Sequence, residues 1–229
     1  MLPGSGSDEV FVRSAFAAPL WAVGIALTAP PPDPGPDVVH GYRRSLDAAL
    51  RAATGPLLVG GISLGAHVAA AWAAEQDPAR LSGLLIALPA WTGPADGAPA
   101  VLAALATAAL VRADGVDAAL ATARAGSPPW LAAELGRAWP RYGDGLAPAL
   151  EATAVTPAPT GAALRSLRVP AGIAGLADDP VHPLAVARHW AGLLPRSALL
   201  TSTLTAFGAD PEVVGRAAVL AWLRAARRG

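Results

Sequence analysis

Cysteine, lysine and asparagine are all absent from this chain of 229 residues. Without cysteine the chain can form no disulfide, no thiolate nucleophile and no cysteine-ligated metal site. Without lysine it can form no Schiff base with a carbonyl substrate. The nearest thing to a ligand cluster is Asp178, Asp179 and His182, and three residues on one tight loop seldom enclose a metal ion. A phosphate-binding glycine loop is also missing, so we expect no metal and no cofactor.

Charge is scarce too, because charged residues make up only 15% of the chain. The 17 basic side chains, all arginine, balance 17 acidic ones. A chain without net charge produces no field that attracts nucleic acid or an anionic membrane surface. We therefore expect a small-molecule substrate, no nucleic-acid partner and no membrane partner, and the composition leaves the oligomeric state open.

Long hydrophobic runs are missing as well. The longest, at about residues 98–111, is shorter than the roughly 20 residues that a bilayer-spanning helix needs. The first ten residues, MLPGSGSDEV, lack the basic and apolar regions of a secretory signal. These features predict a cytoplasmic protein with a disordered leader at residues 1–9 and a single domain at residues 10–229.

Hydrophobic residues, in contrast, make up 53% of the chain and alternate between strand-like and helix-like segments. Strand-like runs occupy residues 10–16, 21–28, 56–62, 81–88, 171–176 and 198–204. Those at 56–62 and 81–88 show no polar alternation, which is typical of strands buried on both faces of a parallel sheet. At about residues 92–167, Ala- and Leu-rich helical stretches interrupt the alternation. The pattern predicts an α/β fold, a mostly parallel doubly wound sheet with a helical cap insertion.

The segment Gly61-Ile62-Ser63-Leu64-Gly65 follows one of these strands and precedes a helix-like stretch. It matches G-x-S-x-G, the nucleophile elbow, in which a serine on a sharp strand-to-helix turn exposes its hydroxyl. The two glycines keep side chains away from the crowded turn. The backbone N–H of Leu64 would lie at a helix N-terminus, where it could stabilise an oxyanion. Ser63 is therefore the candidate nucleophile, and the alternative is a purely structural serine in a glycine-rich turn.

A second motif, Asp179-Pro180-Val181-His182-Pro183, follows the strand-like run at 171–176. Together with the elbow it resembles the α/β-hydrolase superfamily, whose members often carry D-P-x-x-P after a strand in the second half of the chain. The resemblance covers most of residues 10–225. It implies an α/β-hydrolase fold with a helical cap and assigns Asp179 as the catalytic acid, with Asp178 as its neighbour. The alternative for Asp179 is a helix-entry residue held by local backbone bonds.

The histidine of this superfamily is not where the resemblance places it. It normally lies on the loop after the last strand, but residues 205–210 contain none. A His-Gly oxyanion loop is missing near residues 16–19 as well. His182, three residues after Asp179, is the leading candidate for a relocated base, and His40 is the other. The remaining two, His67 and His189, lie within helix-like segments and are expected to pack or to face solvent.

Two functions are consistent with this pattern. The first, which the resemblance implies, is a serine hydrolase that cleaves an ester or thioester of an apolar acyl or aromatic substrate. The alternative is a catalytically degenerate protein of the same fold that serves as a ligand-binding or interaction module. Trp91, Trp130 and Trp139 lie in or beside the cap. They could line an acyl pocket, but core packing is the more common role.

Overall fold

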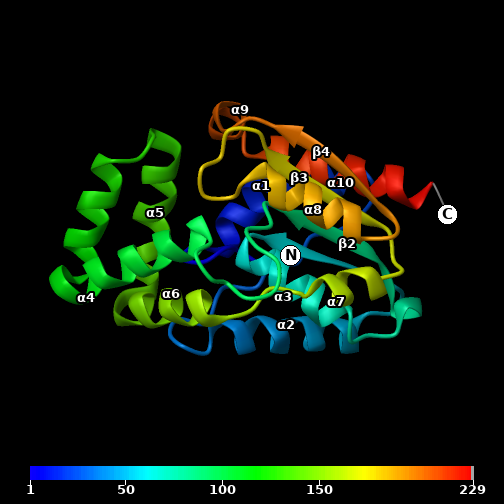
Figure 1. Cartoon of the computed structure of the whole chain (residues 1–229), viewed down its shortest axis with the longest axis horizontal. Helices are drawn as coiled ribbons and strands as arrows, with labels where there is room; N and C mark the ends of the chain where they lie inside the picture. Colours follow the sequence, from blue (N-terminus) through cyan, green and yellow to red (C-terminus); the bar gives the residue numbers. More distant parts are fainter. Residues whose placement is uncertain (228–229) are drawn as a thin grey trace.

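A computed structural model of the chain, in which residues 1–227 are described, is built around one parallel sheet (Figure 1). Its strands are β1 (Leu57–Ile62), β2 (Leu81–Ala87), β3 (Ala171–Leu176) and β4 (Ser197–Ser202). Within the described residues the sheet has four strands in the order β1-β2-β3-β4, and every neighbouring pair is parallel. The predicted α/β architecture with a mostly parallel sheet is therefore confirmed.

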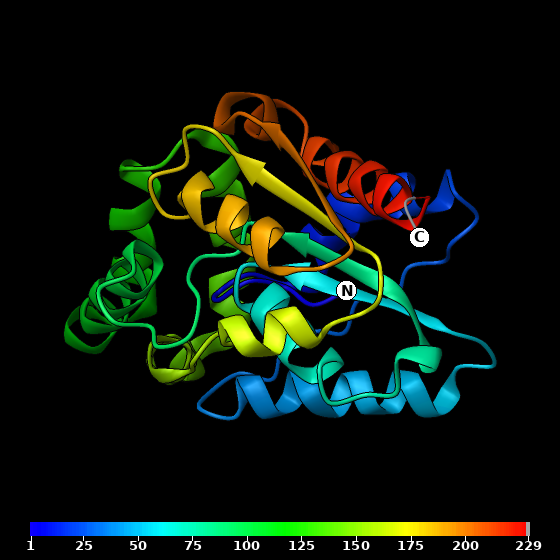
Figure 2. The same ribbon diagram turned by 45° about the vertical axis from the view of Figure 1, so that its right-hand side comes forward.

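The central strands β2 and β3 are buried on both faces, because successive side chains point to opposite sides and helices cover both sides of the sheet. Along β2, Leu84 and Ile86 enter one hydrophobic core, while Leu85 and Ala87 enter the other. The helices that cover the first face are α2 (Val38–Ala52), α3 (Leu64–Ala73), α7 (Gly161–Ser166) and α8 (Leu184–Leu193). Those on the second face are α1 (Glu9–Trp21) and α10 (Glu212–Ala226), so that α8 (orange) and α10 (red) lie on opposite sides of the strands in Figure 2.

A helical insertion separates β2 from β3. It contains α4 (Pro99–Ala125), α5 (Pro129–Tyr142), the short 3-10 turn η2 (Gly143–Gly145), α6 (Leu146–Val155) and then α7. The first three of these helices gather beyond the carboxyl ends of the strands (Figure 1). They therefore lie over the edge of the sheet at which β1 leads into Ser63. The other short 3-10 turn, η1 (Pro78–Arg80), leads into β2.

Helix α4 has the length and hydropathy of a membrane span, although only 22% of its most apolar window is buried. Its backbone is not continuous, because Gly115 has φ 82° and ψ 167°. This break divides α4 into two helical halves, residues 99–114 and 116–125. Neither half reaches the roughly 20 residues needed to cross a bilayer, and α4 packs against α5 and α6.

The two strands predicted at residues 10–16 and 21–28 are wrong. Residues 10–16 lie in α1, and residues 22–28 form a turn followed by extended coil. The Asp8 carboxylate caps α1 by accepting a hydrogen bond from the N–H of Phe11. The apolar residues of the helix recur at helical spacing and pack against α10. The short run VFV fits a strand and a helix equally well, and this distant partner decides between them.

Residues 1–9 are not a disordered leader, which corrects the second expectation for this end of the chain. The N–H of Leu2 donates to the carbonyl of Gly60 at 2.9 Å, and the N–H of Ile62 donates to Leu2 at 3.1 Å. Asp8 is 1% exposed and accepts hydrogen bonds from Arg137 and Arg141 of α5. These contacts hold the segment between the edge of β1 and the cap.

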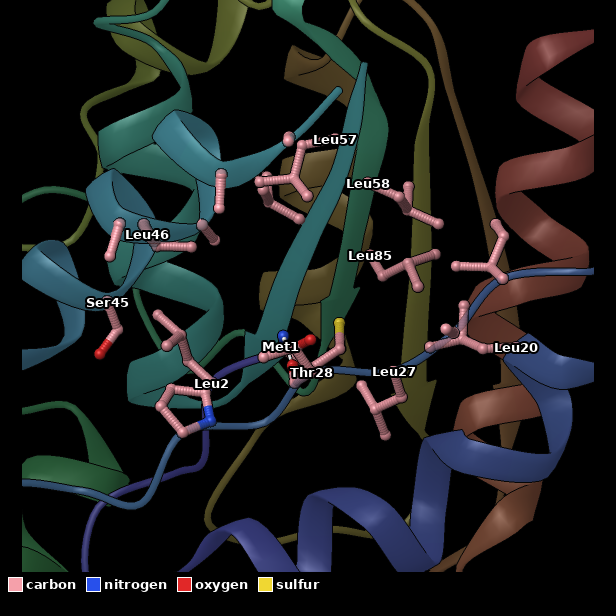
Figure 3. Close-up of a pocket in the computed structure, with 18 residues that line it drawn as sticks. Met1, Leu2, Leu20, Leu27, Thr28, Ser45, Leu46, Leu57, Leu58 and Leu85 are labelled. Carbon is pink, nitrogen blue, oxygen red and sulfur yellow. Dashed lines mark hydrogen bonds between the residues drawn. The ribbon is translucent and has the colours of Figure 1, made fainter. Parts of the chain in front are cut away.

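A cavity of about 560 Å³ lies beside the outer edge of β1 (Figure 3). Leu57 and Leu58 of β1 face it from the sheet, and Leu20, Leu27 and Leu46 close it from the flanking segments. Within residues 1–227 its lining contains no ionisable side chain. Its lining includes none of the predicted site residues Ser63, Asp179 and His182.

Candidate active site

Ser63 occupies the sharp turn between β1 and α3, with φ 51° and ψ −116°. A positive φ is rare for a residue with a side chain and is a form of strain that clusters at functional sites. Both glycines of the motif are required by packing. A Cβ on Gly61 would lie 2.3 Å from the carbonyl carbon of Gly65, and one on Gly65 would lie 2.4 Å from the carbonyl oxygen of Leu2. The turn can form only where these side chains are absent.

The structure brings three of the predicted site residues into one hydrogen-bonded chain. Ser63 Oγ lies 3.0 Å from Nε2 of His182, and Nδ1 of His182 lies 2.9 Å from Oδ2 of Asp179. The other carboxylate oxygen of Asp179 accepts from the N–H groups of Val181, at 2.8 Å, and His182, at 3.1 Å. A serine, a histidine and an aspartate in this order form the arrangement of a nucleophile, its base and an orienting carboxylate.

The environment of Asp179 favours its ionised form. Its side chain is 7% exposed, and burial raises the pKa of the carboxyl. The hydrogen bond and the charge interaction with His182 and the two backbone N–H groups outweigh this effect and hold the pKa of Asp179 below its ordinary value. An ionised carboxylate at Oδ2 requires the proton of a neutral imidazole to be on Nδ1. Nε2 is then the acceptor for the hydroxyl of Ser63.

The other three histidines lie elsewhere. His40 is exposed on α2 and His189 is exposed on α8, and neither lines the cleft that contains Ser63. His67 is buried; its Nε2 accepts a hydrogen bond from the N–H of Ala90 at 2.9 Å, and burial lowers its pKa to about 3. Of the two candidates for a relocated base, the structure therefore places His182, and not His40, beside Ser63.

The segment in which the superfamily histidine was expected serves a different purpose. Residues 204–209 form the short helix α9 (Leu204–Ala209), and its Phe207 packs edge-on against Phe11 and Trp130, with ring centroids 5.7 and 5.2 Å apart. The carboxylate of Asp178 accepts a hydrogen bond from the N–H of Leu204 at 2.6 Å and fixes the start of this helix. The position contributes an aromatic wall instead of an imidazole.

Ser63 opens into a cleft of about 370 Å³ between the sheet and the cap. Its walls are mainly apolar and include Trp130 and Trp139, whereas Trp91 is buried edge-on against His67. Two of the three tryptophans therefore line the cleft, and the third belongs to the core. The ionisable side chains that line it, among residues 1–227, are Glu134, Asp179 and His182.

One part of the site was missed from the sequence. The loop Gly4-Ser5-Gly6 runs directly beside the elbow, because a Cβ on Gly4 would lie 3.5 Å from the Cβ of Ser63. Residues 16–19, where the resemblance places an oxyanion loop, lie instead within α1. Two closely spaced glycines near the start of the chain were the signal that could have revealed it. Within the described part of the chain, the N–H groups of Ser5 and Leu64 have no hydrogen-bond acceptor.

Comparison with known proteins gives a match at the level of structure alone. No family model matches the chain, and no curated relative matches it. MenH from Staphylococcus aureus superposes with a TM-score of 0.71 at 16% identity, over 99% of this chain and 92% of its own. A thermophilic esterase from Thermogutta terrifontis gives 0.69 at 20% identity, over 98% and 88%. The non-heme bromoperoxidase candidate BpoC of Mycobacterium tuberculosis H37Rv gives 0.71 at 19% identity, over 97% and 90%.

Proposed function

We propose, starting from the α/β-hydrolase fold that this chain has, that it is a serine hydrolase acting on an ester or thioester. The observation that carries the proposal is the continuous chain of hydrogen bonds from Ser63 through His182 to Asp179, at 3.0 and 2.9 Å. An unactivated hydroxyl is a poor nucleophile, and an imidazole at hydrogen-bond distance supplies the missing base.

The proposed mechanism gives each of these groups a defined role. His182 Nε2 takes the proton of Ser63 as Oγ attacks the substrate carbonyl, and Asp179 stabilises the imidazolium that forms. The negative charge on the carbonyl oxygen is stabilised by the N–H of Leu64, with the N–H of Ser5 as the second candidate donor. The imidazolium then gives its proton to the departing alcohol or thiol. Water, activated by His182, releases the acyl group from Ser63 in the second half of the reaction.

The walls of the cleft support an apolar acyl or aromatic substrate. Phe11, Leu88, Trp130, Leu135 and Phe207 face the same space as Ser63. Removing apolar surface from water is favourable by about 25 cal/mol per Å², which favours an apolar group in this cleft. A polyanion or a free sugar would leave most of its polar groups without partners in such a cleft. The similarity in fold to a thermophilic esterase agrees with an ester substrate and does not bear on its acyl group.

The alternative is that the chain is a degenerate binding module. Its main argument was that no histidine follows the last strand, and the position of His182 removes the need for one there. We therefore favour the serine hydrolase over the binding module.

A serine-directed fluorophosphonate tests the proposal directly. We expect the wild-type protein to be labelled at Ser63, as mapped by mass spectrometry of the peptides. Ser63→Ala should abolish labelling, and His182→Ala should slow it strongly. His40→Ala is the matched control, because His40 is an exposed histidine, and it should be labelled at the wild-type rate. A folded wild-type protein that is not labelled at Ser63 would support the binding module instead.

A further inference from the structure

A second carboxyl group, which the proposed mechanism does not use, lies in the wall of the cleft. Glu134 projects from α5, and its residue is only 6% exposed. It lines the same cleft as Ser63, whose other walls are mainly apolar. Glu residues are rarely buried to this extent without a charged partner.

Within the described residues, one oxygen of the Glu134 carboxyl group accepts a hydrogen bond and the other does not. The hydroxyl of Ser7 donates to Oε1. Within residues 1–227 no group donates to Oε2, yet this atom is not among the fully enclosed polar atoms that lack a partner. Because Glu134 lines the cleft, we infer that Oε2 is accessible from it.

Within the described residues, Glu134 forms no ion pair with the arginine whose charge acts on it. Arg137, one helical turn along α5, donates both its Nε and one terminal nitrogen to Asp8, each at 2.9 Å. Burial therefore dominates, and it raises the pKa of Glu134 to about 7 despite the hydrogen bond from Ser7. A buried, half-partnered carboxyl destabilises the fold, so its presence in a binding cleft suggests that a ligand completes its hydrogen bonding.

Glu134 and Ser63 belong to one continuous surface. The N–H of Ser7 donates to the carbonyl of Gly4 at 3.2 Å, which makes residues 4–7 a tight turn with end Cα atoms within about 7 Å of each other. Gly4 abuts Ser63 at one end of this turn, and Ser7 holds Glu134 at the other. A chain of several bonds would therefore be needed to connect a carbonyl at Ser63 with a group at Glu134.

We propose that Glu134 is a specificity-determining residue, which accepts a hydrogen bond from a hydroxyl group at the remote end of the substrate's acyl chain. This inference rests on the proposed function and names its substrate class, the esters of hydroxy-substituted acyl chains. A neutral donor is favoured over an ammonium group for two reasons. The positive charge of Arg137 acts on the same region, and the apolar walls would strip water from a charged group without replacing it.

Three p-nitrophenyl esters test the proposal: the hexanoate, the 6-hydroxyhexanoate and the 6-aminohexanoate. The quantity to measure is the kcat/KM of each substituted ester divided by that of the hexanoate. At pH 8, above the pKa of Glu134 of about 7, we expect Glu134→Leu to lower the hydroxy ratio by about tenfold or more, as for the loss of a hydrogen bond to a charged group. Glu134→Gln, which keeps an oxygen acceptor and nearly the same shape, should lower it less and provides a reading if the leucine variant does not fold. Glu151→Leu, a change at an ion-paired residue on α6 outside the cleft, is the control and should leave the ratio unchanged.

The outcomes separate this inference from the function on which it rests. Hydrolysis of the hexanoate with a hydroxy ratio that neither variant of Glu134 changes would overturn the inference and leave the hydrolase proposal standing. A preference for the amino ester that disappears in Glu134→Leu would replace the hydroxyl with a cation and also overturn it. If the folded wild-type protein hydrolyses none of the three esters, both proposals fail together.

Discussion

Replacing Glu134 with glutamine should change how the stability of the protein depends on pH. The pKa of Glu134 is about 7 in the folded state and 4.5 in the reference state. Over this interval the folded protein keeps a proton that the unfolded chain has already lost. Glu134 therefore contributes its full stabilisation of the folded state below pH 4.5, and this stabilisation is lost as the pH rises through about 7. The interval corresponds to about 3 kcal/mol of unfolding free energy, and most of it is lost between pH 5 and pH 8.

Glutamine isolates this effect, because it stays neutral at every pH and keeps an oxygen that can accept the hydrogen bond from Ser7. Urea unfolding at pH 5 and at pH 8 provides the measurement. We expect the loss of stability on going to pH 8 to be about 3 kcal/mol smaller in Glu134→Gln than in the wild type. Other titrating groups, including Asp179, contribute equally to both proteins and cancel. Glu151→Gln is the control, since Glu151 is a half-exposed carboxylate in an ion pair. Equal pH dependence in Glu134→Gln and the wild type would refute the reasoning.

Three further predictions concern the site and its support. His182→Ala should lower the kcat/KM for an activated ester by about 10²- to 10⁴-fold through loss of the base, whereas His40→Ala should leave it unchanged; equal activities in the two variants would exclude His182 as the base. Asp179→Asn should lower kcat/KM by about 10⁴-fold, because the amide stabilises the wrong tautomer of the imidazole; circular dichroism should show an intact fold, and wild-type kinetics would contradict the role. Gly65→Ala should lower the unfolding free energy by about 1–3 kcal/mol in urea, since its Cβ would lie 2.4 Å from the carbonyl oxygen of Leu2; unchanged stability would show that residues 1–9 are not packed as described.

The parts of this protein that follow from the sequence are those determined by local spacing. The apolar runs that become β1, β2 and β3 lack polar alternation, and a strand buried on both faces needs such a run. The elbow is a five-residue motif whose glycines remove the side chains that would clash within it. Asp179 and His182 are three residues apart, so their proximity also follows from the chain itself.

Other features depend on partners that are distant in the sequence. His182 is 119 residues from Ser63, and only the packing of β1 beside β2 and β2 beside β3 brings it to the hydroxyl in preference to His40. Residues 10–16 are helical because the apolar side chains on one face of α1 pack against α10.

The first nine residues give the clearest example of this division. They look like a polar, glycine-rich leader in the sequence, yet Asp8 is held by Arg137 and Arg141, about 130 residues away, and Gly4 lies against Ser63. Local spacing determines which backbone shapes a segment can adopt. Which of these shapes is stable depends on the buried surface and the charged partners that the rest of the chain supplies, and these exist only after the chain has folded.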